Sequence, residues 1–101
     1  MEERNLTERL SKITDEIKEL REQIAILQME QSDLNFKWLI ADSDCYISTT
    51  TPDCFDKAIE IYTKLMHVKR ALFLAKYKLR HLRNMLNGIY GYLASEDGNG
   101  N

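Results

Sequence analysis

The chain has 101 residues, of which 44% are hydrophobic and 30% charged, with one Pro and four Gly. This length allows one domain at most, and the scarcity of Gly and Pro favours long amphipathic helices. The net charge of −2 argues against non-specific nucleic-acid binding, no run of ~18 apolar residues predicts a membrane span, and the acidic start is unlike a secretory signal. We therefore expect a soluble, cytoplasmic protein that does not contact a membrane.

The first predicted element is a helix over about residues 6–41, because apolar residues recur there with the 4-3 spacing of a heptad repeat. More than four heptads of this kind predict a coiled coil. Gln31 is the one polar residue in the row, and it either selects register and partner or lies at the wet edge of the seam. The row comprises Leu6, Leu10, Ile13, Ile17, Leu20, Ile24, Leu27, Gln31, Leu34 and Trp38.

Residues 42–51 interrupt the repeat and are predicted to form a loop, because Asp, Ser and β-branched residues disfavour helix. Thr51 and Pro52 have the pattern of a helix N-cap followed by the first helical residue. Asp42, Asp44 and Asp53 crowd this loop, but without the Gly and Glu of a calcium loop they predict a solvated turn. We also expect Trp38 to be largely buried near the turn, in a cluster with Phe36, Leu39, Ile40 and Phe55.

Cys45 and Cys54 flank the predicted loop. In a reducing compartment they are expected to be free thiols, while the sequence alone does not establish whether their geometry suits a disulfide. His67 and His81 lie far from both cysteines along the chain. The sequence therefore predicts no metal site.

The second predicted helix covers about residues 52–93 and repeats apolar residues with 3-4 spacing. Ile59, Tyr62, Met66 and Phe73 lie beside this row, so the apolar face is wider than a two-helix seam requires. Residues 96–101 are predicted to be a disordered polar tail. The row comprises Ala58, Ile61, Leu65, Val68, Leu72, Ala75, Leu79, Leu82, Leu86, Ile89 and Leu93.

Two helices of similar length predict an all-α fold: one domain over residues 1–95, formed by a long antiparallel helical hairpin or coiled coil that assembles into a helical bundle. The competing arrangement is a parallel dimeric coiled coil of the first helix, with the second packed elsewhere. A homo-oligomer, with a dimer favoured, would bury the apolar residues left over from the seam, which are Ile26 and Met29 on the first helix and Ile59, Met66 and Phe73 on the second. The predicted oligomer or partner surface comprises Leu10, Ile17, Ile24, Gln31, Trp38, Ile59, Met66 and Phe73.

Charge is divided along the chain. Residues 1–60 contain fourteen acids and seven bases, whereas residues 61–95 contain seven bases and no acid. The bases either form salt bridges across the seam and cover apolar surface with their stems, or form an anion-binding face to which Tyr77, Tyr90 and Tyr92 add stacking. The predicted anion-binding residues are Lys64, Lys69, Arg70, Lys76, Lys78, Arg80 and Arg83.

No motif in the sequence predicts catalysis or a cofactor, because Gly-rich phosphate loops, nucleophile elbows and zinc-protease signatures are all missing. The sequence instead indicates a non-enzymatic interaction protein that self-associates and binds a protein partner, whose identity it does not specify. One alternative is a binder of nucleic acid or a phosphate-bearing ligand through the basic helix, the less favoured partner class. Another is a small inhibitor, for example a viral one, of a larger nucleic-acid-handling machine.

Overall fold

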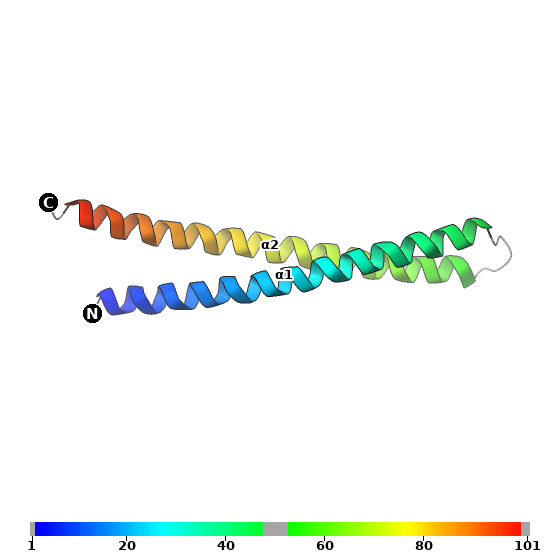
Figure 1. The fold of residues 1–101 in the computed structure, drawn as a ribbon, viewed down its shortest axis with the longest axis horizontal. Coiled ribbons are helices and arrows are strands. Elements are labelled where there is room, and N and C mark those ends of the chain that lie inside the picture. The colour runs from blue at the N-terminus through cyan, green and yellow to red at the C-terminus, as the bar shows by residue number, and fades with distance from the viewer. Residues whose placement is uncertain (1, 48–52, 100–101) are drawn as a thin grey trace. The chain divides into compact units, whose positions relative to one another are not determined.

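Two long helices form all of the structure that the computed structural model describes, which covers residues 2–47 and 53–99. Helix α1 is Glu2–Ile47 and helix α2 is Asp53–Asn99 (Figure 1). Within each part of the chain the two helices pack against each other in opposite directions. The predicted all-α hairpin is thereby confirmed, and the competing arrangement with the second helix packed elsewhere is wrong.

The chain divides into two compact units, and each contains a segment of both helices. The terminal unit consists of Met1–Gln23 and Ala75–Asn101, and the central unit is Ile24–Leu74.

The buried side chains come from the two heptad rows. In the terminal unit Ile13, Ile17 and Leu20 of α1 and Ala75 and Leu82 of α2 are buried; in the central unit Ile24, Cys45, Ala58, Leu65 and Leu72 are buried. Leu65, which is 2% exposed, is the least accessible of them. Because each row presents one narrow stripe to the other helix, the seam is a single line of apolar contacts.

Both helices extend beyond their predicted bounds. Residues 42–47 continue α1 instead of forming a loop, because Ala41 and Cys45 prolong the 4-3 row and their packing outweighs the weak helix propensity of Asp and Ser. Residues 96–99 continue α2 instead of forming a disordered tail, since each added turn extends an existing ladder. Asp53 and Asp56 lie in the first turn of α2, where the helix dipole favours acids. The proposed cap at Thr51 and Pro52 lies outside the described residues.

The predicted aromatic cluster at the turn is wrong. Phe36 and Phe55 are 64% and 61% exposed, and Leu39 and Ile40 are exposed as well. Phe36, Leu39 and Ile40 lie outside the heptad row of α1, so their side chains project away from α2. Trp38 is half-buried rather than largely buried, and its ring lies 6.0 Å from that of Tyr62 at a tilt of 48°.

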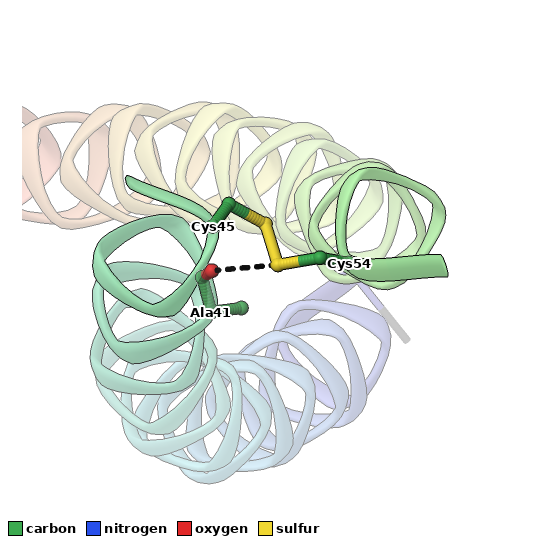
Figure 2. The surroundings of a disulfide bond; sticks show 3 residues. All are labelled: Ala41, Cys45 and Cys54. Atoms are coloured by element: carbon green, nitrogen blue, oxygen red, sulfur yellow. Dashed lines mark hydrogen bonds between the residues drawn. A yellow bond between two sulfur atoms is a disulfide. The ribbon is translucent and has the colours of Figure 1, made fainter. Parts of the chain in front are cut away.

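The expectation of free thiols is also wrong. Cys45 and Cys54 form a disulfide with an S–S distance of 2.03 Å and a Cα–Cα distance of 5.6 Å (Figure 2). The bond forms because both cysteines continue the buried rows. Cys45 follows Ala41 by four residues in the row of α1, and Cys54 precedes Ala58 by four residues in the row of α2. Their side chains therefore face each other across the seam at a separation that a disulfide spans.

Candidate interaction surfaces

A second apolar stripe lies on the side of α1 that faces away from α2. We call it the α1 outer stripe: Ile26, Met29, Asp33, Phe36 and Ile40, which follow one another at steps of three and four residues. Its four apolar side chains are between 47% and 74% exposed. Because the helix advances about 100° per residue, these positions fall almost opposite the buried row. The hairpin itself therefore cannot cover this stripe.

Helix α2 has a corresponding stripe, which we call the α2 outer stripe: Phe55, Ile59, Tyr62, Met66, Lys69 and Phe73. Its five apolar side chains are between 46% and 68% exposed. These positions lie about a quarter turn from the buried row, on one flank of α2. Both outer stripes belong to the central unit.

Each outer stripe contains a single charged residue. Asp33 interrupts the α1 outer stripe and pairs with Lys37 of the same helix, with 3.0 Å between Lys37 Nζ and Asp33 Oδ2. That pair is well exposed on both sides, so it contributes little stability and exchanges partners easily. Lys69 interrupts the α2 outer stripe and makes no ion pair with any residue that the structure describes.

The terminal unit is much less apolar at its surface. Among its described side chains, the exposed large apolar residues are Tyr77, Met85, Tyr90 and Tyr92, and all four belong to α2. Over residues 5–23 of α1, no large apolar side chain is exposed. Exposed apolar surface is therefore concentrated on the central unit.

The flank of α2 that carries its outer stripe becomes basic after Phe73. At the same heptad positions stand Lys76, Arg80, Arg83 and Asn87. The three cations line a shallow depression of about 340 Å³ on the terminal unit, together with Leu79, Asn84 and Asn87. All three are exposed.

The bases of residues 61–95, here called the basic row, were expected to form salt bridges with α1, but no such salt bridge is found among the described residues. The ion pairs Lys37–Asp33 and Lys64–Glu60 each lie within one helix. Lys69, Arg70, Lys76, Lys78, Arg80 and Arg83 pair with no acid in the described parts of the chain. The reason is geometric: these bases project from the flanks and the outer side of α2, and such long, solvated side chains gain little from holding a surface pair.

The structure separates the predicted oligomer surface into two groups. Ile17 and Ile24 are buried in the seam, and Leu10, Gln31 and Trp38 are half-buried along the same row. Ile59, Met66 and Phe73 are exposed on the α2 outer stripe. The α1 outer stripe was recognised only in part: Ile26 and Met29 were identified as apolar residues left over from the seam, but the 3-4 spacing that joins them to Phe36 and Ile40 was not.

The described side chains contain no arrangement suited to metal binding: no three His, Cys, Asp or Glu residues gather into a group that could hold an ion. Neither helix, over its described range, has a stretch that is long and apolar enough to cross a membrane.

Comparison with protein-family models, curated proteins and solved structures finds no match for this chain.

Proposed function

We propose that this protein is a non-enzymatic interaction module that self-associates and binds a protein partner through the two outer stripes of its central unit. The observation that supports this most directly is the exposure of nine large apolar side chains in two stripes, each with a single charged residue. Scattered apolar residues are ordinary on a protein surface, but contiguous exposed patches mark interaction sites.

The energetic argument points the same way. Fully burying an exposed side chain of this size contributes roughly 1.5–3 kcal/mol, and these side chains, which are 46–74% exposed, would contribute about half to three quarters of that. Even a few of the nine would offset much of the entropic cost of association, which is of order 4–15 kcal/mol. A hairpin with one narrow seam also has a thin core, so a second layer of packing would add to its own stability.

Sedimentation velocity across the micromolar range tests self-association. We expect the unmodified protein to sediment as an oligomer, and a triple variant, Met29→Gln, Phe36→Gln and Phe73→Gln, to sediment as a monomer. The matched control replaces Tyr77 and Met85 by Gln; both are exposed apolar residues of the terminal unit and lie outside the stripes. An unmodified protein that stays monomeric at the highest concentration would contradict the proposal.

Binding of a separate protein partner is tested with the same variants. Affinity capture from the native host with the unmodified protein should retain a partner that the triple variant loses and the control variant keeps. Equal recovery with all three proteins would place partner binding outside the stripes.

A second function is favoured by one specific observation: Lys76, Arg80 and Arg83 share one depression and have no acidic partner among the described residues. We infer that this site binds a phosphate-bearing ligand. Its one ammonium and two guanidinium groups, together with the side-chain amides of Asn84 and Asn87, can donate hydrogen bonds to phosphate oxygens.

Titration with a short single-stranded oligonucleotide and with inorganic phosphate, at about 50 and 200 mM salt, tests this second function. Binding should weaken as salt rises and should be lost when Lys76, Arg80 and Arg83 are changed to Gln. The matched control changes Lys12, Lys18 and Arg21 to Gln, which removes the same charge from α1. Absence of binding at the lower salt concentration would exclude the site.

The disulfide bears on where the protein acts. Disulfides persist in oxidising compartments and are rare in the cytosol. The Cys45–Cys54 bond therefore favours an oxidising compartment over the cytoplasm expected from the sequence. Alkylation of thiols in intact host cells, followed by mass analysis, would show whether both cysteines are blocked or free.

A further inference from the structure

The two outer stripes have the same spacing. Along the α1 outer stripe, the steps from Met29 to Asp33, Phe36 and Ile40 are four, three and four residues. Along the α2 outer stripe, the steps back from Phe73 to Lys69, Met66 and Tyr62 are also four, three and four. Two helices can interdigitate along their length when their apolar rows repeat with the same steps.

Antiparallel alignment of these rows places Asp33 opposite Lys69. The same alignment places Met29 opposite Phe73, Phe36 opposite Met66, and Ile40 opposite Tyr62. At each of these four positions a residue of matching chemistry lies opposite: three apolar pairs and one pair of opposite charges. Ile26, the remaining residue of the α1 outer stripe, lies outside these pairs.

Parallel alignment with the same steps gives a worse match. It places Asp33 against Met66 and Lys69 against Phe36, so two charged groups would enter an apolar contact without a partner. An unpaired charge in such a contact is strongly disfavoured. Antiparallel pairing of the α1 outer stripe with a second copy of itself, with matching steps, places Asp33 opposite Phe36, so this arrangement also puts a charge into an apolar contact without a partner.

This contact cannot form within one chain. The α1 outer stripe faces away from α2, and the seam already sets the intramolecular register through the Cys45–Cys54 bond and the contact between the rings of Trp38 and Tyr62. The residues that complement Asp33 and its neighbours must come from another molecule.

We propose that the occupant of each outer stripe is a second copy of this chain: the α1 outer stripe of one copy packs antiparallel on the α2 outer stripe of another, with Asp33 and Lys69 paired at its centre. This inference rests on the proposed function, since it specifies how the self-association is built. Opposite charges at the middle of an apolar contact fix its register and direction while adding little affinity.

The placement of the stripes also specifies the kind of assembly. On α1 the stripe lies almost opposite the seam, whereas on α2 it lies on a flank. Each copy therefore presents two different surfaces in two different directions, and the contact is heterologous. Repetition of a heterologous contact produces a closed ring when the rotation closes and a chain when it does not.

Charge reversal tests the pairing. Asp33→Lys and Lys69→Asp should each weaken self-association by about tenfold or more, because each creates like charges at the centre of the contact. Each variant should keep its helical circular dichroism and, at concentrations low enough to dissociate the unmodified protein, its melting temperature within a few degrees, since both residues are exposed. The matched control reverses Glu30 and Arg70, exposed charges of the central unit that lie outside the stripes.

Mixing the two reversed variants gives the decisive result. In an equimolar mixture, the α1 outer stripe of D33K can pair with the α2 outer stripe of K69D, and this contact again has opposite charges at its centre. We expect D33K and K69D, each defective alone, to co-assemble when mixed, and fluorescence transfer between labelled copies to report it.

Two results would overturn the pairing while leaving the proposed function intact. One is an unmodified protein that associates while neither reversal weakens it; the other is a pair of weakened variants that fail to co-assemble on mixing. An unmodified protein that does not associate at all would instead defeat the proposed function itself.

Discussion

The sulfur atoms of Cys45 and Cys54 join α1 to α2, and Cys45 is only 5% exposed. The Sγ atom of Cys54 also lies 3.8 Å from the backbone carbonyl oxygen of Ala41 (Figure 2). A disulfide sulfur has no hydrogen to donate, so this is a contact in the oxidised protein. After reduction, the Cys54 thiol has this carbonyl as an acceptor within reach, and Cys45 remains in the apolar seam.

Removing the disulfide should destabilise the hairpin without abolishing it. The bond joins two residues with a sequence separation of 9. Closing a loop of that size restricts the unfolded chain and contributes about 2–3 kcal/mol to the free energy of unfolding. We expect the double variant Cys45→Ala and Cys54→Ala, and the reduced unmodified protein, to melt at lower temperature than the oxidised protein. Thermal circular dichroism measures this, and equal melting temperatures in all three would contradict a stabilising role.

The contact between Trp38 and Tyr62 gives a fluorescence test of the central unit. Changing Tyr62 to Ala removes a ring that lies 6.0 Å from the single tryptophan and exposes more of the indole. Emission should therefore shift to longer wavelength, and the free energy of unfolding should fall by about 0.5–1.5 kcal/mol beyond the loss of buried area. Tyr77→Ala, at an exposed site of the terminal unit, is the control and should leave the emission unchanged.

The seam is the part of this molecule that periodicity predicts well. Ile13, Ile17, Leu65 and Leu82 are buried where the two rows place them, since one narrow apolar row fixes which side of a helix faces its partner. Helix ends were predicted less well. Local propensity favoured a loop after Ala41, but packing at Cys45 continued the helix.

The candidate surfaces could be predicted only in part. Some members of both outer stripes were recognised as apolar residues left over from the seam: Ile26 and Met29 on α1, and Ile59, Met66 and Phe73 on α2. Phe36 and Ile40 were instead assigned to a core near the turn, because composition shows that a residue is apolar but not which direction it faces. The missing salt bridges of the basic row could not be foreseen either, since the pairing of long surface side chains depends on small energy differences.

Leu65 and Leu74 allow a comparison of the same side chain in two environments. Leu65 is 2% exposed and Leu74 is 54% exposed, although both lie on α2 in the central unit. Leu65→Ala should lower the free energy of unfolding by about 2–5 kcal/mol, because it leaves a cavity in the seam. Leu74→Ala should change it by less than about 0.5 kcal/mol. Chemical denaturation of both variants at fixed protein concentration measures the difference, and similar values would place Leu65 outside the core.

Replacing the glycines of α2 should stabilise the terminal unit. Gly88 and Gly91 lie inside the helix without positive φ angles, and a Cβ atom added at either position would meet no other atom within 4 Å. Alanine costs less backbone entropy than glycine in a helix, so each substitution should add about 1 kcal/mol to the free energy of unfolding. Thermal melts of Gly88→Ala, Gly91→Ala and the double variant test this, and the two effects should add approximately. A fall in melting temperature for either single variant would contradict the expected gain.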